Sequence, residues 1–292
     1  MELHHLKTFT IVAREGSLTR AAQLLLLSQP AVSGHIKVLE DELGTALFER
    51  TTKGMQLTRE GNLLLEDAER TLAAAKALVN HARSLRGDVA GPVALGIAGD
   101  PVALRLGLLL SRLRGAHPGL TVQVSHHVSA EVVERVLDGR LEAGFVLEER
   151  PDTALRHVRI AAVRLRIVGP VAWRGGIEGA GWSDLAALPW IGTPPRCSFH
   201  RIAARAFARH GAVPRTVVEV DQESALKALV MDGLGLALLR EDQALAAEAA
   251  GEVALWPGEG LESHLHFILP SRKEQEPAIQ AMRDAVQAVW GQ

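Results

Sequence analysis

The residues best suited to chemistry lie in one short run, residues 28–37, which reads SQPAVSGHIK. Gln29 can form two hydrogen bonds with an adenine edge, and Ala31 can touch a thymine methyl group. The Ser33 hydroxyl and the Lys37 ammonium suit phosphate oxygens, which position a protein on DNA. If the run is helical, it therefore predicts a surface that enters the major groove. The candidate DNA contacts on it are Ser28, Gln29, Pro30, Ala31, Ser33, His35 and Lys37.

The surrounding residues predict the helices that would hold this run. Ser17 and Ser28 are suited to cap the N-termini of a second and a third helix, and Pro30 fits the first turn of the third, where no N–H is needed. Gly16 and Gly44 are placed to end the first and third helices. The third helix would bury one apolar stripe, made of Val32, Ile36, Leu39 and Leu43.

A tight hairpin is expected next, over residues 47–57. Its turn residues, Thr51 to Gly54, are typical of short hairpins. Arg50 and Lys53 would project from this hairpin as a wing. Both are therefore further candidates for contact with the DNA backbone or the minor groove.

One long helix is expected from Thr58 to about Arg86. Apolar residues recur along it at spacings of three and four, as in a coiled coil, at Leu65, Ala68, Leu72, Ala75, Val79, Ala82 and Leu85. Gly87 and the Gly91-Pro92 pair interrupt the pattern, so a linker is expected there.

After Pro92 the pattern changes to alternating strands and helices, which indicates parallel sheets with crossover helices. Strands are expected at 93–97, 120–124, 143–147, 190–191, 217–220, 236–239 and 264–269, and helices at 102–113, 131–137, 199–210, 224–231 and 274–290. Between residues 157 and 171 two strand-like runs follow each other closely. Two small α/β subdomains fit this order better than one continuous sheet.

Composition and charge restrict the class of protein. A chain of 292 residues is long enough for two or three cores. The formal net charge is -2, so any DNA binding depends on a local surface. Residues 1–58 hold six Lys or Arg and six Asp or Glu, three of these acids at 40–42, away from the proposed DNA face. A three-helix bundle that binds protein, or nothing, therefore remains an alternative.

The sequence also predicts a location in the cell. Cys197 is the single cysteine, so no internal disulfide can form and a reducing compartment fits best. The N-terminus lacks the apolar core and cleavage site of a signal peptide. The longest apolar runs, such as 24–27 and 106–110, are too short to cross a bilayer. A cytoplasmic protein with no membrane partner is expected.

The N-terminal motifs occur together in a known family. The stretch EGSLTRAAQLLLLSQPAVSGHIKVLEDELGTALFERTTKGMQLTREG resembles the DNA-binding end of LysR-type transcriptional regulators, with ELG..LFER and LT..G in order and at the family's spacing. Weaker matches follow at AHPGL (116–120), DGRLEAGF (138–145), LPWI (188–191) and MDGLGLALL (231–239).

The resemblance implies a multidomain fold with α+β and α/β parts. A winged helix-turn-helix would span residues 1–58, a linker and dimerisation helix 59–87, and an effector domain 92–292. That domain would have two α/β lobes, resembling periplasmic binding proteins. Lobe I would take about 92–161 and 266–292, and lobe II about 162–265.

The resemblance also implies function and partners. The protein would be a sequence-specific transcription regulator and not an enzyme, controlled by a small-molecule effector. It would bind double-stranded promoter or operator DNA, associate with itself as a homodimer or homotetramer, and act on RNA polymerase. The chain departs from the family at Gly34, where a basic or long polar residue is common, and at Val38, where the family is often basic, so fewer phosphate contacts are expected.

A function of another class is kept as the alternative: a small-molecule-binding or enzymatic α/β protein with an appended helical interaction module. The sequence contains neither the G-x-S-x-G motif of α/β hydrolases nor a Walker A motif, and no cofactor is expected.

The resemblance places the effector between the two lobes, where helix N-termini favour anions. Asp100 stands where the family often has Ser or Thr, and Arg196 could supply a positive charge opposite it, which suits a zwitterion or an amine-bearing metabolite. The alternative is that Asp100 only caps a helix begun by Pro101. The candidate effector contacts are Gly99, Asp100, Pro101, Val128, Ser129, Phe145, Leu147, Thr193, Arg196, Cys197, Ser198, Asp221 and Gln222.

Cys197 falls near the reactive cysteine of thiol-sensing members of the family. A packed thiol is the favoured interpretation, because no second cysteine is present to resolve an oxidised one. His264 and His266 share one face of a strand, whereas the adjacent pairs His4-His5 and His126-His127 are expected to point in different directions. No acid or cysteine lies at ligand spacing from these histidines, so no metal site is expected.

Overall fold

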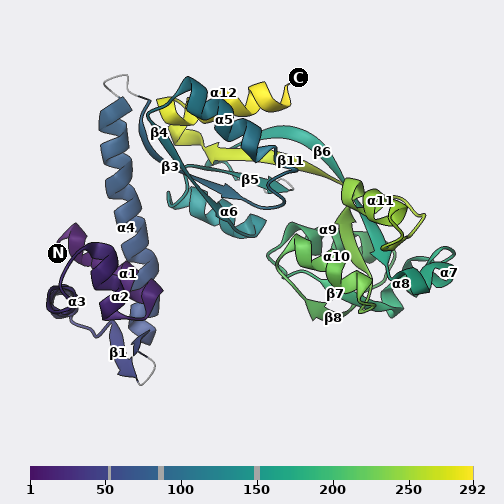
Figure 1. Cartoon of the computed structure of the whole chain (residues 1–292), viewed down its shortest axis with the longest axis horizontal. Coiled ribbons are helices and arrows are strands. Elements are labelled where there is room, and N and C mark those ends of the chain that lie inside the picture. The colour runs from purple at the N-terminus through teal and green to yellow at the C-terminus, as the bar shows by residue number, and fades with distance from the viewer. Residues whose placement is uncertain (52–53, 85–88, 148–151, 292) are drawn as a thin grey trace. The chain divides into compact units, whose positions relative to one another are not determined.

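The computed structural model describes residues 1–51, 54–84, 89–147 and 152–291, and its helices and strands are labelled in Figure 1. The chain folds as two compact units, the first made mainly of the residues up to 85 and the second of nearly all the rest. In the described residues no helix combines the length and apolar character needed to span a membrane.

Three short helices of the first unit begin and end where the sequence predicts. They are α1 (Leu3–Glu15), α2 (Leu18–Leu25) and α3 (Gln29–Leu43). The hydroxyls of Ser17 and Ser28 each accept a hydrogen bond from the backbone N–H three residues further on. Gly16 and Gly44 end α1 and α3 in the left-handed conformation, with φ of 60° and 68°. The predicted caps are confirmed, and they fix the α2–turn–α3 pair.

The core of this unit forms where the three helices meet. Phe9, Val12, Val32, Ile36 and Leu39 are all at most 4% exposed, which confirms most of the predicted stripe on α3. The prediction that the stripe continues to Leu43 is wrong. That side chain is 39% exposed, because it lies in the last turn of α3 beside the exposed Gly44.

The predicted hairpin is confirmed as the antiparallel strands β1 (Phe48–Thr51) and β2 (Gly54–Leu57). Helix α4 (Arg59–Ser84) follows directly. Thr58 caps it, since its hydroxyl accepts from the Gly61 N–H at 2.9 Å and donates to the Ala46 carbonyl at 2.8 Å. The Thr58 N–H donates to the Leu47 carbonyl at 3.0 Å. The start of α4 is thereby fixed to the chain that leads into the hairpin.

The apolar stripe of α4 divides into two parts. Leu65, Ala68 and Leu72 pack against the core of the first unit. Further along, Val79 is 52% exposed and Ala82 is also exposed. Within the described part of this single chain, the second half of the stripe is therefore uncovered.

The second unit is a mixed α/β structure, which confirms the expected fold class. Its strands are β3 (Gly91–Ile97), β4 (Leu120–His126), β5 (Ala143–Leu147), β6 (Leu155–Gly169), β7 (Pro189–Gly192), β8 (Arg215–Glu219), β9 (Ala237–Arg240), β10 (Ala254–Leu255) and β11 (Leu261–Pro270). Its helices are α5 (Leu106–Ala116), α6 (Ser129–Leu137), α7 (Arg174–Ile177), α8 (Trp182–Ala187), α9 (Ser198–Arg209), α10 (Glu223–Met231), α11 (Glu241–Ala249) and α12 (Pro277–Trp290). Strand β3 pairs in parallel with β4 and β5, and β7 with β8.

The expected division into two α/β subdomains is confirmed, but one sheet runs through both of them, and β7 with β8 forms a separate two-stranded sheet. Seven strands form one sheet in the order β10-β6-β11-β5-β3-β4, with β9 also paired to β6. The two runs expected between 157 and 171 belong to the single long strand β6, which crosses with β11 from one half of the unit to the other (Figure 1). Each half still has its own core, one around Phe145 and Phe267 and the other around Trp190 and Phe207. We call these halves lobe I and lobe II.

Helix α5 starts later than predicted, at Leu106 instead of Val102. Residues 101–105 form turns, and Arg105 adopts a left-handed φ of 47°. The guanidinium of Arg105 donates to the Val289 carbonyl at 2.9 Å and lies over the Trp290 ring at 4.5 Å, so contacts with α12 hold the turn. The short helices α7 and α8 were not predicted, because segments of four and six residues carry little periodic signal. Helix α11 was not predicted because its apolar residues do not gather on one face.

Candidate DNA-binding face and effector pocket

Helix α3 has an exposed face that carries polar side chains. Gln29, Pro30, Gly34, Lys37 and Val38 are exposed, while the apolar stripe of the same helix is buried. Gly34 leaves this face open, because a Cβ added there would meet nothing within 4 Å. Gly34 and Val38 thus both lie on the exposed surface of α3, and neither supplies a charge.

The other predicted DNA contacts lie in several places. Ser28 is exposed at the N-cap of α3, and Ala31 and Ser33 are half-buried. The side chain of Arg50, whose backbone belongs to β1, and the whole of Lys53 fall outside the described residues.

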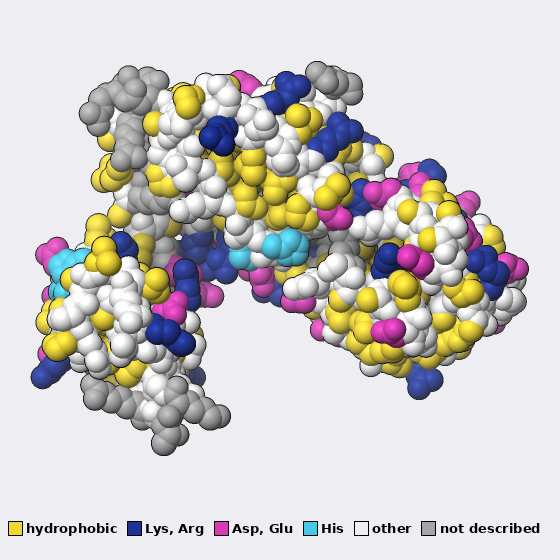
Figure 2. All heavy atoms as spheres, viewed as in Figure 1, with side chains coloured by type: hydrophobic (Ala, Val, Ile, Leu, Met, Phe, Trp, Pro, Cys, Tyr) yellow, Lys and Arg dark blue, Asp and Glu magenta, His cyan; other side chains and the backbone are white. Residues whose placement is uncertain are grey.

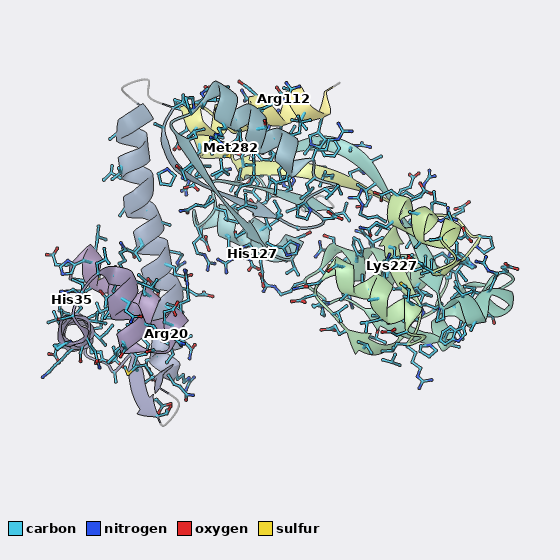
Figure 3. The ribbon with its side chains drawn as sticks, viewed as in Figure 1. Arg20, His35, Arg112, His127, Lys227 and Met282 are labelled. Carbon is cyan, nitrogen blue, oxygen red and sulfur yellow. The ribbon has the colours of Figure 1, made fainter. Side chains whose placement is uncertain are left out.

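The ring of His35 faces α1 and not the exposed face of α3 (Figure 3). Its Nδ1 lies 3.0 Å from the hydroxyl of Thr8, and its ring centroid lies 4.8 Å from that of His4 and 5.1 Å from that of His5. Partial burial first, and then the neighbouring His4 and His5, lower the pKa of His35 below its ordinary value. The neutral ring is therefore favoured.

Glu40 joins α3 to the hairpin. One of its carboxylate oxygens accepts hydrogen bonds from the backbone N–H groups of Leu47 at 2.8 Å and Phe48 at 3.2 Å. The acidic cluster at 40–42 is thus partly structural, which its sequence alone did not reveal. The same carboxylate sets the position of the wing relative to α3.

Replacing Glu40 by Ala should lower the stability of the first unit by about 2 kcal/mol, because two backbone N–H groups lose a charged acceptor. Hydrogen exchange in peptides covering residues 45–60 measures the effect. Asp41→Ala, one position along on the exposed surface, is the matched control and should leave exchange unchanged. Equal acceleration in both variants would rule out the bridging role of Glu40.

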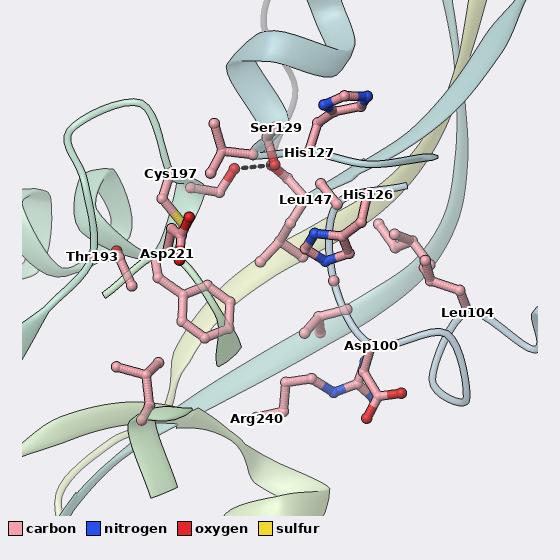
Figure 4. Close-up of a pocket in the computed structure, with 18 residues that line it drawn as sticks. Asp100, Leu104, His126, His127, Ser129, Leu147, Thr193, Cys197, Asp221 and Arg240 are labelled. Carbon is pink, nitrogen blue, oxygen red and sulfur yellow. Dashed lines mark hydrogen bonds between the residues drawn. The ribbon is translucent and has the colours of Figure 1, made fainter. Parts of the chain in front are cut away.

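A pocket in the second unit lies where several strands end (Figure 4). Lobe I contributes the loops that follow β3 and β4 and the end of β5. Lobe II contributes the segments that follow β7 and β8, together with the end of β9. Ligands in α/β proteins commonly bind at the carboxyl ends of such strands. The pocket has about 690 Å³ of empty space, a figure that includes its open mouth to solvent.

The pocket has mostly apolar walls with a few polar groups. The residues lining it are Ala98, Gly99, Asp100, Leu104, His126, His127, Val128, Ser129, Leu147, Val163, Thr193, Cys197, Ser198, Phe199, Asp221, Leu226, Arg240 and Leu265. Pro101 and Gln222 line an adjoining hollow that shares Asp100, His126 and Asp221 with it. Of the thirteen predicted effector residues, only Phe145 and Arg196 line neither hollow.

Phe145 and Arg196 have other roles. Phe145 is fully buried in the lobe I core against Phe267, because strand alternation turns it to the face opposite its neighbours on β5. The guanidinium of Arg196 forms an ion pair with Glu134 on α6, so it does not face Asp100 and does not supply the expected positive charge.

Asp100 caps a turn and also reaches the other lobe. Its Oδ1 accepts from the Val102 N–H at 2.7 Å, and its Oδ2 accepts from the side-chain amide of Gln243 at 3.2 Å. Asp100 thus caps a turn, although the helix expected to begin at Pro101 begins only at Leu106, and the Asp100 carboxylate lines the pocket.

Arg240, and not the predicted Arg196, is the arginine that lines the pocket. It stands at the end of β9 and lines the pocket, where Figure 4 shows it beside Asp100. Its Nε and Nη2 donate to the two oxygens of Asp242 at 3.0 and 3.1 Å, which leaves Nη1 without a partner in the described residues. Burial alone would raise the pKa of Asp242, but the hydrogen bonds and charge of Arg240 lower it below its ordinary value. The guanidinium is therefore held rigidly with one edge free.

Two further polar groups face the pocket. Thr193 is 6% exposed, and its buried hydroxyl has no hydrogen-bond partner in the described residues, as expected of a group that meets a ligand. His127 lies 2.9 Å from the Ser125 hydroxyl, and burial first and then Arg135 lower its pKa despite the opposing effect of Glu131. By contrast, the Ser198 hydroxyl is engaged with the Leu147 carbonyl of lobe I.

Comparison with known proteins identifies the two units. The family model of the bacterial regulatory helix-turn-helix protein, lysR family, matches residues 3–62, and that of the LysR substrate binding domain matches residues 86–291. This chain belongs to the LysR family. It is therefore a helix-turn-helix transcription regulator with a substrate-binding domain, and not an enzyme.

Relatives of similar length support the same family. The regulator TcbR of Pseudomonas sp. (strain P51) is 30% identical over 96% of both chains, and the SDS degradation transcriptional activation protein of Pseudomonas sp. (strain ATCC 19151) is 32% identical over 98% of this chain and 95% of its own. The crystal structure of CbnR, a LysR family transcriptional regulator, matches with a TM-score of 0.70 at 28% identity over 99% of both chains. These findings favour the regulator over the enzymatic alternative.

In this LysR-family regulator, sequence analysis missed several polar residues that line the two hollows, among them His126, His127, Arg240 and Gln243. A usable signal existed for Arg240, because it directly follows the strand predicted at 236–239, and the loops that hold Asp100 and Asp221 also follow predicted strands. Gln243 carried no such signal, since α11 was not predicted.

Proposed function

We propose that this LysR-family protein acts in the cytoplasm as a sequence-specific regulator that binds double-stranded operator DNA through α3 and the hairpin, and that a small molecule in the inter-lobe pocket controls it. Residues 1–58 form the DNA-binding domain, 59–87 the linker helix and 92–292 the effector domain. RNA polymerase is the partner on which the bound regulator acts.

Self-association through α4 is part of the proposal. The exposed second half of the apolar stripe, with Val79 and Ala82, is a surface that a second α4 would cover. A homodimer formed in this way, or a homotetramer of two such dimers, brings together several DNA-binding domains. This compensates for an α3 that lacks charge at Gly34 and Val38, because linked modules bind DNA more tightly than single ones.

The exposed polar face of α3 carries the DNA-binding proposal. Gln29 and Lys37 are both exposed on α3, outside the buried stripe. Gln29 is assigned to a base edge, and Lys37, with Ser28 and Ser33, to phosphates. CbnR, whose structure complexed with its target DNA matches this chain with a TM-score of 0.68 at 29% identity, supports the assignment of DNA binding to this unit.

Binding to operator fragments selected from genomic DNA tests this proposal. Gln29→Ala should weaken operator binding about tenfold to a hundredfold and leave binding to random DNA nearly unchanged, because only a base contact discriminates sequences. Lys37→Ala should weaken both and reduce the slope of log affinity against log salt by about one. Asp41→Ala is the control on the same helix. Equal affinity of the intact protein for operator and random DNA would contradict the proposal.

The pocket chemistry supports a zwitterionic effector of amino-acid type. The free edge of Arg240 suits a carboxylate. Asp221, whose carboxylate has no partner in the described residues, and Asp100 suit an ammonium group. Leu104, Phe199 and Leu226 offer apolar surface for a side chain. The effector would hold the two lobes together, because it contacts both.

A further inference from the structure

Three histidines from two helices meet on the first unit, outside the face proposed to bind DNA and far along the chain from the effector pocket. His4 and His5 lie in the first turn of α1, and His35 lies on α3. Their ring centroids are 4.2, 4.8 and 5.1 Å apart, and Figure 2 shows imidazoles gathered on the surface of this unit. Against the sequence expectation, the rings of the adjacent pair come together, and His35 completes a group of three.

The nitrogens of these rings are close enough to share one ion. One nitrogen of each ring lies within 4.8 Å of the others. In a tetrahedral zinc site, nitrogens at about 2.0–2.1 Å from the metal are about 3.4 Å apart. The nitrogens must therefore come closer together by about 1.4 Å at most. Rotation of the exposed His4 side chain and small movements of the other two rings would bring them to that distance.

Thr8 prepares His35 as a metal ligand. The Thr8 side chain is buried, and its hydroxyl donates to the His4 carbonyl at 2.8 Å. Its oxygen must therefore accept from His35 Nδ1, 3.0 Å away. This places the proton of His35 on Nδ1 and leaves the Nε2 lone pair free. Hydrogen bonding of the outer ring nitrogen is the usual support of a metal-binding histidine.

His5 supplies an independent indication of a ligand. Its Nδ1 is buried and has no hydrogen-bond partner in the described residues. Buried polar atoms are almost always satisfied, so an unpartnered imidazole nitrogen beside two other imidazoles indicates a missing partner. An electron-pair acceptor that three imidazoles can share is a divalent transition metal ion, and three histidines with one open position are a known ligand set for zinc.

We propose that His4, His5 and His35 bind one Zn²⁺ ion, with water as the fourth ligand, and so join the first turn of α1 to α3. Thr8 is a positioning residue for this site, because it touches His35 and not the metal. The site is separate from the effector pocket and does not depend on the effector assigned above.

Titration of the untagged, full-length chain with Zn²⁺ in competition with a chromophoric chelator tests the site. The wild type should bind one Zn²⁺ per chain. His4→Gln and His35→Gln should each weaken this binding by more than about tenfold. His4 is exposed, so the first variant cannot fail merely by unfolding the core. His117→Gln, in the second unit, is the matched control and should bind as the wild type does.

Two further measurements locate the ion and examine Thr8. Zn²⁺ should slow hydrogen exchange in peptides from α1 and α3 and leave the second unit unchanged. Thr8→Val should weaken zinc binding about tenfold, whereas Thr8→Ser, which keeps the hydroxyl, should restore it.

Unchanged zinc affinity in His4→Gln and His35→Gln would overturn the proposal. So would protection confined to peptides that contain His126, His127, His264 or His266.

Discussion

Replacing Gly61 by Ala should lower the stability of the first unit by about 3 kcal/mol, at the upper end of the usual cost of overpacking. A Cβ at this position would lie 2.1 Å from the carbonyl oxygen of Leu47. That oxygen cannot move away cheaply, because it accepts the Thr58 N–H that fixes the start of α4. Since the obstacle is backbone and not the end of a flexible side chain, the whole junction between α4 and the hairpin must shift.

Gly34→Ala is the matched control for this substitution. Both glycines are helical, but a Cβ at Gly34 would meet nothing within 4 Å. Helix propensity then decides the result, and the variant should be more stable by about 1 kcal/mol. The same substitution, Gly to Ala, is therefore expected to lower the stability of the first unit at Gly61 and to raise it at Gly34.

Hydrogen exchange of peptides within residues 1–62 is the appropriate measurement. All five tryptophans lie at or beyond Trp173, so fluorescence would follow the second unit. Exchange should accelerate in α3 and in the hairpin of Gly61→Ala and slow in α3 of Gly34→Ala. Stabilisation by both substitutions would show that the α4 junction tolerates a Cβ and would contradict the close approach.

Local signals in the sequence were sufficient to predict the helices of the first unit and where they begin and end. Caps such as Ser17 and Ser28 act through hydrogen bonds three residues away, so the sequence itself contains both partners. The LT..G motif is visible in the sequence, but the physical reason for its glycine is not. Gly61 is required by the Leu47 carbonyl, and that contact depends on how the hairpin folds back.

The effector pocket shows where sequence reasoning fails. The family resemblance named Asp100 and Asp221 as effector contacts, and both line the pocket, each in a loop that follows a strand. The choice between Arg196 and Arg240 needed side-chain directions, which depend on Glu134 and Asp242. The sequence did not predict the histidine cluster either, because His35 approaches His4 only after α1 and α3 pack against each other.

Arg240→Gln should weaken binding of a zwitterionic effector by about 2 kcal/mol, roughly thirtyfold in Kd, because a carboxylate loses a charged donor. A thermal-shift series first identifies the ligand class, by comparing amino acids with matching acids that lack the amine and matching amines that lack the acid. A ligand at about 100 times its Kd stabilises the folded state by about 2.7 kcal/mol, so binding is readily seen. Trp182, Trp190 and Trp256, close to the lobe II core, report on unfolding of this lobe.

Arg196→Gln is the control that makes the comparison decisive. Both variants remove one guanidinium from lobe II, but Arg196 pairs with Glu134 outside the pocket, whereas the free edge of Arg240 lies in it. The Arg196 variant should therefore keep the ligand-induced shift that the Arg240 variant loses. Retention of the full shift in Arg240→Gln, together with its loss in Arg196→Gln, would return the positive charge to the residue that the sequence first suggested. It would also mean that the lobes close differently around the ligand.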